Sequence, residues 1–336
     1  MVKVSLRRRT LALAASGVAL GLVGCADMDV RRMPQPEADA ATGGILTPWL
    51  SLTGGWRVDG NTPLPGAAPT GARVNFLQPT GVAARNDFLL VADSGTRMLW
   101  RVDRVRNTVA PLAPFTGGVP DHGTSIQVGY DFTAWVALPA EHVVVQYDIR
   151  GRVVRRWRED ADVMRPVAVV VPEDRSEVLV GDAATSTIMV FDPLGNPRGL
   201  LGGRDPPALR SLTAMALGPR GLYVLDRIAR QVLVLDRRGQ PVAAIGGQQL
   251  LRPRALAVDA SGRVFVGDDG DQRIKVFRDD ELLGSIGGSG NGPARFGRIE
   301  SLALDGNLLY VADSINMRVQ IMTVAPVPLA SSERAR

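Results

Sequence analysis

An all-β fold, a ring of six four-stranded antiparallel sheets, is predicted by three features of this 336-residue sequence. A short apolar segment ending in a polar turn recurs every 42 to 45 residues. Each repeat holds four apolar runs of strand length separated by turn signals, and no helical stretch of useful length interrupts them. Four strands in a repeat of this length are typical of a propeller blade, so the sequence predicts a six-bladed β-propeller.

The second strand of each repeat, strand b, carries the clearest marker. We expect it at residues 88–93, 133–138, 177–182, 221–226, 263–268 and 308–313. It ends in Asp in five repeats, at Asp93, Asp182, Asp226, Asp268 and Asp313, whereas Leu138 takes this place in the second repeat. A ring of carboxylates around a metal is one interpretation. A turn carboxylate that accepts backbone N–H bonds is the other, and we favour it because a structural role recurs in every blade.

The other three strands follow from the same alignment. Strand a, nearest the centre of the ring, precedes the marker, as at 254–259 and 299–305. Strand c follows it at 98–103, 143–148, 188–192, 232–236, 274–277 and 319–322. Strand d is an apolar run such as 242–245 or 283–286, usually before Gly-Gly, and hairpin signals such as 193–196 separate c from d.

The last repeat lacks an outer strand of its own. After Val324 the chain continues Ala-Pro-Val-Pro, which is a poor strand. An open ring would leave two sheet edges exposed to aggregation. The segment 50–55, Leu-Ser-Leu-Thr-Gly-Gly, has the form of the strand d segments, so we expect residues 47–53 to close the last blade as an N-terminal strand.

Repeats five and six resemble the NHL family most closely. Residues 251–277 follow that family's strand pattern, and Asp313, Asn316 and Arg318 have its characteristic spacing. The glycine-rich segment 287–296 is similar to the family's connection between repeats. The resemblance extends over 76–324 and is weakest in the second repeat. It implies a six-bladed propeller, a fold that does not by itself choose a function.

The N-terminus has the features of an export signal. Arg7, Arg8 and Arg9 precede an apolar run at 11–23, which is too short to span a bilayer. Leu22-Val23-Gly24-Cys25 ends in the only cysteine and resembles a bacterial lipoprotein signal, which implies that the Cys25 thiol is the lipid-attachment site. The alternative is an ordinary secretory signal with an incidental cysteine.

This signal predicts the domain organisation and the location. We expect a signal peptide at 1–24, a lipidated tether at 25–45, the propeller at 46–325 and a C-terminal tail at 326–336. The mature chain would be anchored in the cell envelope through Cys25. Because Ala26 follows the cysteine where Asp commonly retains lipoproteins at the inner membrane, we expect the outer membrane, facing the periplasm, in a Gram-negative host.

The charge of the mature chain argues against nucleic acid as a partner. The full chain has a formal charge of +5, but Lys3 and the three arginines lie in the signal, and removing it leaves +1. Nucleic-acid binding needs a basic patch that survives maturation. We therefore expect a monomeric, membrane-anchored protein with a protein or anionic envelope ligand as its partner, and no cofactor.

The chemical candidates are few. His122 and His142 are the only histidines and lie in one repeat, which is too few for a histidine-rich zinc site. Acidic candidates for a calcium site exist at Glu141, Glu173 and Glu300, but no motif links them. We expect a binding or scaffold module. The alternative is a metal-dependent lyase or a lactonase-type hydrolase on the same fold.

Arginines suggest where a partner would bind. In a propeller the b–c turns and the d–a connections share one face, which we call the b–c face. Arg97, Arg230, Arg254 and Arg298 fall in or beside these segments and are our candidate partner surface. A solvated rim balanced by Asp205, Asp269 and Asp271 explains the same pattern equally well. The long connection 56–78 is expected to lie over this face.

Overall fold

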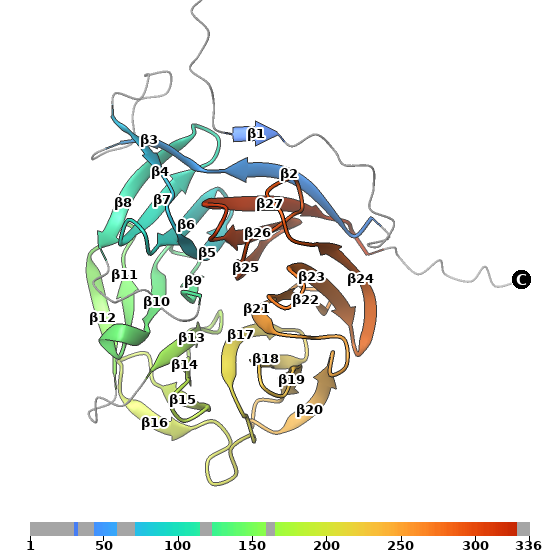
Figure 1. Cartoon of the computed structure of the whole chain (residues 1–336). Helices are drawn as coiled ribbons and strands as arrows, with labels where there is room; N and C mark the ends of the chain where they lie inside the picture. Colours follow the sequence, from blue (N-terminus) through green and yellow to red (C-terminus); the bar gives the residue numbers. More distant parts are fainter. Residues whose placement is uncertain (1–29, 33–43, 59–70, 115–122, 159–164, 328–336) are drawn as a thin grey trace, which may run out of the picture.

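The computed structural model describes residues 30–32, 44–58, 71–114, 123–158 and 165–327. They form six sheets arranged as blades around a central channel, which confirms the predicted all-β, six-bladed propeller (Figure 1). Pairing within the blades is antiparallel except between β3 and β8. In this part of the chain no helix is long and apolar enough to cross a membrane.

Blades two to five each consist of four consecutive strands, numbered from the channel outwards. Blade two is β9 (Ile126–Val128), β10 (Ala134–Leu138), β11 (Val143–Tyr147) and β12 (Val153–Trp157), and blade three is β13 (Pro166–Val170), β14 (Val178–Asp182), β15 (Thr187–Phe191) and β16 (Pro197–Leu200). Blade four is β17 (Leu212–Gly218), β18 (Gly221–Asp226), β19 (Gln231–Leu235) and β20 (Pro241–Ile245), and blade five is β21 (Pro253–Val258), β22 (Arg263–Asp268), β23 (Arg273–Arg278) and β24 (Glu281–Gly287).

Blade six is closed by a strand from the N-terminal side, as predicted. Its own strands are β25 (Ile299–Asp305), β26 (Leu308–Asp313) and β27 (Arg318–Val324). Strand β2 (Leu46–Leu52) pairs antiparallel with β27, from Leu46 opposite Val324 to Leu52 opposite Val319. Figure 1 shows β2 in blue along the outside of the red blade. The first and last blades are thereby joined without an open seam.

Additional strands lie at the outer edges of two blades. Blade one contains β5 (Pro79–Arg85), β6 (Phe88–Asp93), β7 (Met98–Asp103) and β8 (Thr108–Pro114), and then β3 (Gly54–Arg57) and β4 (Arg73–Asn75) extend it to six strands. Strand β1 (Val30–Arg32) pairs with β2, within the segment that we expected to be only a tether. Cys25, the signal segment and residues beyond 327 lie outside the described residues.

The long connection 56–78 does not begin over the b–c face. Strand β3 runs parallel to β8, and the Trp56 N–H donates to the Asn107 carbonyl at 2.9 Å, in the c–d turn on the opposite face. The expected position is therefore wrong for the start of this segment, whereas its last residues, Leu77 and Gln78, bond to Asp93 at the b–c face. The outer edge of β8 offers unpaired backbone groups that β3 satisfies, and this tertiary pairing leaves no mark in the local sequence.

The core is divided among six clusters of buried side chains, one between each pair of neighbouring blades. The cluster between blades six and one joins Leu52 of the closing strand to Leu89 and Trp100 of blade one and to Tyr310 and Ile321 of blade six. Each blade thus buries both of its faces against neighbours, and the ring requires all six interfaces.

Candidate functional site

The repeated aspartates fasten two segments of each blade together. In blade one, Asp93 is fully buried and accepts from the N–H groups of Leu77 at 2.9 Å and Gln78 at 2.7 Å, just before strand a. It also accepts from the Gly95 N–H in the b–c turn, at 3.1 Å. The carboxylate therefore fixes the start of strand a against the turn that follows strand b.

The same arrangement recurs in four other blades. In each of these blades the residue immediately before strand a donates its N–H to the carboxylate at the end of strand b, at 2.8 to 3.2 Å. The pairs are Arg165 with Asp182, Ser211 with Asp226, Arg252 with Asp268 and Arg298 with Asp313. Blade two has Leu138 instead, and its b–c turn is a short 3₁₀ helix, Pro139–Glu141, that ends at His142 with φ of 56°. Five clamps thus give the b–c face a rigid frame.

One position in strand a is turned towards the channel in a regular way. In five blades the pairing of strand a with strand b shifts register around a single residue, which is a β-bulge. Bulges redirect side chains and are common beside functional sites. The bulged residues and the equivalent residue of blade two form a ring of buried side chains: Thr80, Thr124, Val167, Thr213, Arg254 and Glu300. We call it the mouth ring.

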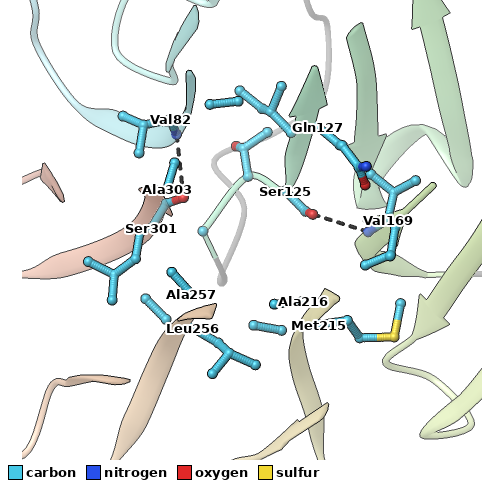
Figure 2. A pocket seen from close by; sticks show the side chains of 18 of the residues that line it. Val82, Ser125, Gln127, Val169, Met215, Ala216, Leu256, Ala257, Ser301 and Ala303 are labelled. Carbon is cyan, nitrogen blue, oxygen red and sulfur yellow. Dashed lines mark hydrogen bonds between the residues drawn. The ribbon is translucent and has the colours of Figure 1, made fainter. Parts of the chain in front are cut away.

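The channel beneath this ring holds a cavity of about 340 Å³, lined by strand a segments of all six blades. Two serines at equivalent positions of their blades form hydrogen bonds between neighbouring blades in its wall. Ser125 Oγ accepts from the Val169 N–H at 3.1 Å and Ser301 Oγ from the Val82 N–H at 3.4 Å (Figure 2). Figure 2 shows Met215 and Leu256 on the opposite side of the cavity. Apolar side chains thus line part of the wall, but the surface that the cavity exposes is mostly polar.

Ionic groups occupy the part of the mouth formed by blades five and six. Arg254 Nε donates to Glu300 Oε2 at 2.7 Å, and both side chains are less than 10% exposed. The Ser314 hydroxyl donates to Glu300 Oε1 at 3.2 Å. The guanidinium of Arg298 lies 4.0 Å from Glu300 Oε1 and 4.0 Å from Asp269 Oδ1. The ion pair is therefore fixed, with a more exposed arginine above it.

Hydroxyl groups occupy the neighbouring part, formed by blades one and two. Thr80 Oγ1 lies 2.9 Å from Ser94 Oγ and 2.9 Å from Thr124 Oγ1, so the three hydroxyls form a buried chain. Gly123 carries the backbone past blade six so closely that a Cβ there would lie 2.1 Å from the Glu300 carbonyl oxygen. Only glycine fits at position 123. Because Gly123 passes so close to Glu300, the adjacent Thr124 and its hydroxyl chain lie beside the ion pair.

The structure separates the four predicted partner arginines into two groups. Arg97 and Arg230 are exposed at the ends of the b–c turns of blades one and four, which lie on opposite sides of the ring, with φ of 54° and 55°. Arg298 is half-buried, and Arg254 is buried in the mouth ring. The four arginines therefore do not form one surface patch: Arg97 and Arg230 point outwards, and Arg254 and Arg298 lie at the channel.

The other chemical candidates are dispersed. His142 and Glu141 lie in the blade-two turn and Glu173 on the face opposite the mouth ring, whereas His122 lies outside the described residues. Among the described residues no group of three or more His, Cys, Asp or Glu could hold a metal ion. The sequence analysis missed Thr80, Thr124 and the pairing of Arg254 with Glu300, because the six equivalent positions do not have one residue type and the bulge leaves no visible signal in the sequence.

Comparison with known proteins supports the repeat assignment. No family model matches the chain. The chain is 31% identical to NHL repeat-containing protein 3 of Mus musculus over 117 residues. This match covers 33% of this chain and 34% of the mouse protein. This chain is a six-bladed propeller, and part of it is similar to an NHL repeat protein. It is also 22% identical over 274 residues to the chloroplastic protein SUPPRESSOR OF QUENCHING 1 of Arabidopsis thaliana, covering 62% of this chain and 26% of that protein. The chain therefore spans only about a quarter to a third of these curated relatives.

Solved structures of low sequence identity share the fold. A Bacteroides thetaiotaomicron protein of unknown function has a TM-score of 0.58 at 14% identity, over 74% of this chain and 70% of that one. A gluconolactonase from Xanthomonas campestris has a TM-score of 0.55 at 16% identity, over 76% and 91%. Virginiamycin B lyase from Staphylococcus aureus has a TM-score of 0.52 at 11% sequence identity, and the match covers 76% of this chain and 86% of the lyase chain. At such identities the likeness extends to the fold alone.

Proposed function

We propose that this propeller is a lipid-anchored binding module of the bacterial cell envelope. Cys25 carries the anchor, and the b–c face binds a protein or an anionic glycan or lipid. The observation that carries the proposal is the set of five aspartate clamps, which hold the b–c turns rigid while exposing Arg97 and Arg230 at their ends. A rigid surface loses little conformational entropy when it binds, and exposed guanidinium groups suit an anionic partner.

Reversing the charge of the two outward arginines tests this face. We expect Arg97→Glu with Arg230→Glu to reduce recovery of the partner by at least about 10-fold when the lipidated protein captures it from detergent-solubilised envelopes, since two favourable charge contacts become repulsive. Arg237→Glu with Arg238→Glu is the matched control, because both residues are exposed on the c–d turn of blade four, on the other face. Equal losses in both variants would refute the assignment of the face.

The anchor has its own test. We expect Cys25→Ser to abolish lipid attachment and to leave either uncleaved precursor or unlipidated protein in the soluble fraction. Mass spectrometry of the native N-terminus measures this directly, and the expected wild-type product begins at Cys25 with a diacylglyceryl group. A wild-type product that begins elsewhere, or carries no lipid, would contradict the anchor and leave the face assignment untouched.

A metal-dependent lyase or lactonase is the second candidate. It is supported by the gluconolactonase and lyase neighbours and by the carboxylate of Glu300, which lines the channel cavity. Hydrolysis of gluconolactone that requires added Ca²⁺ and is abolished by Glu300→Gln would favour this function over the binding module. Unchanged lactone under the same conditions favours the binding module.

A further inference from the structure

The mouth of the channel has a feature that the outward arginines do not explain. A buried ion pair and a buried chain of hydroxyls lie side by side above a cavity of about 340 Å³. A cavity of this size can hold a small molecule, and its mostly polar surface with converging polar groups suits a polar ligand. We propose that the mouth ring binds a small hydroxyl-bearing organic anion, such as a sugar acid or a phosphosugar. This inference does not depend on the lipid anchor or on the partner of the b–c face.

Charge at the mouth favours an anion. Among the described residues of this cluster, three arginines, Arg252, Arg254 and Arg298, gather around two carboxylates, Asp269 and Glu300, so the described side chains carry one more positive than negative charge. Arg252 and Arg254 lie 3.3 Å and 2.7 Å from their carboxylate partners. An incoming acidic group would therefore find the excess charge at the third arginine.

Arg298 is the residue that would receive the acidic group. Its guanidinium lies 4.0 Å from each carboxylate, beyond hydrogen-bonding distance, and makes no hydrogen bond with a described residue. Its side chain is 43% exposed, whereas its own backbone N–H is held by Asp313 at 3.2 Å. The backbone is thus fixed at the mouth while the planar donor group stays open to a carboxylate or phosphate, which it can bind with two hydrogen bonds.

Hydroxyl groups of the ligand have partners within the same cavity. Thr124 lines the cavity and shares its hydrogen bond with Thr80, which leaves lone-pair capacity on the Thr124 oxygen for a ligand hydroxyl. Glu300 is held in place by Arg254 and Ser314 and can accept a further hydrogen bond from a hydroxyl. Gly123 keeps these two acceptors close together, because any side chain at that position would push blade two away from blade six.

The aspartate clamps and the bulges prepare this site before a ligand arrives. Asp313 and Asp268 fix the backbone at Arg298 and Arg252, and the bulges turn Arg254 and Glu300 inwards. A site arranged in advance binds more tightly because less freedom is lost on binding. Val167 at the equivalent position of blade three contributes no polar side-chain atom, so recognition falls on the other blades.

Isothermal titration of the mature chain, residues 25–336, tests the proposal. The probes are D-glucuronate and glucose 6-phosphate, with D-glucose and acetate as probes that carry only hydroxyls or only charge. We expect a Kd below about 1 mM for at least one of the two hydroxyl-bearing anions and at least about 10-fold weaker binding of glucose and of acetate. Comparison of glucuronate with glucose 6-phosphate distinguishes a carboxylate from a phosphate ligand.

Two variants and a matched control locate the binding. We expect Arg298→Gln to weaken binding of the preferred anion by about 10-fold and Thr124→Val by about 5-fold, with melting temperatures close to that of the wild type. Arg238→Gln, which removes an equal charge from the exposed c–d turn of blade four on the opposite face, should leave binding unchanged. The proposal fails if neither anion binds, if acetate binds as tightly as both, or if Arg298→Gln binds like the wild type.

Discussion

Deleting the closing strand Leu46–Leu52 is expected to abolish cooperative folding of the whole propeller. The strand pairs with β27 along its length, and Leu46, Leu50 and Leu52 are each at most 4% exposed. Burial of a leucine side chain contributes about 1.5–3 kcal/mol, and a protein of this kind is stable by only about 5–15 kcal/mol. The deletion removes three such side chains and also exposes the edge of β27, so the loss is comparable to the entire stability.

Single substitutions give a graded version of the same experiment. Leu52→Ala should cost about 2–5 kcal/mol in urea unfolding, because it leaves a cavity between blades six and one. Thr47→Ala is the matched control on the same strand, and its half-buried side chain should cost less than about 1 kcal/mol. A deletion variant that melts cooperatively at the wild-type temperature would show that β2 does not seal the ring.

Asp268→Ala is expected to be strongly destabilising. Asp268 is fully buried and accepts from the N–H groups of Leu251 and Arg252 and from the ammonium of Lys275, at 2.7 to 2.8 Å. Removing it leaves backbone donors without an acceptor and a buried lysine with Asp271 as its only carboxylate contact among described residues. Losing one partner of a buried charge pair costs about 3–5 kcal/mol.

Asp226→Ala measures what the backbone hydrogen bonds of a clamp contribute to stability without an ion pair. Asp226 accepts three backbone N–H groups in blade four, at 2.7 to 3.1 Å, and has no lysine partner, so its loss should cost about 1–3 kcal/mol. Adding Lys275→Met to Asp268→Ala should recover part of the difference, because the unpaired charge is removed. Equal unfolding free energies for Asp226→Ala and Asp268→Ala would contradict this explanation of blade five.

The carboxylate of Asp268 also makes the stability of the protein depend on pH. Burial raises the pKa of Asp268, but the Leu251 N–H and the Lys275 ammonium outweigh it, and the net pKa lies below its ordinary value. A carboxyl with a lowered pKa contributes fully above its unfolded value of about 3.9 and loses this contribution as the pH falls through the folded value. Urea unfolding should therefore show the gap between wild type and Asp268→Ala narrowing below about pH 4.

The sequence was sufficient for features that repeat. The strand b markers, the six blades and the N-terminal closing strand follow from apolar periodicity and from the missing outer strand after Val324. The strands β3 and β4 could not be found this way, since β3 is specified by the open edge of β8, far along the chain. Local composition marked this segment only as rich in proline and glycine.

The mouth ring shows a different limit of sequence reasoning. Three of its six residues are threonine, but Val167, Arg254 and Glu300 take the other places, so alignment of the repeats does not indicate a common site. The bulge that turns them inwards is a property of pairing between strands, and the contact of Arg254 with Glu300 joins two separate blades. Arg254 therefore looked like a surface residue in the sequence, although it is buried beside the channel.

The most direct measurement of the proposed role is hydrogen–deuterium exchange of the lipidated protein in native envelope vesicles, compared with the purified protein in detergent. The proposal predicts slower exchange in the vesicles for the b–c turns around Arg97 and Arg230. It predicts no change for the c–d turn around Arg238 on the opposite face. Slower exchange confined to the opposite face, or identical exchange in both preparations, would contradict a binding role for the b–c face.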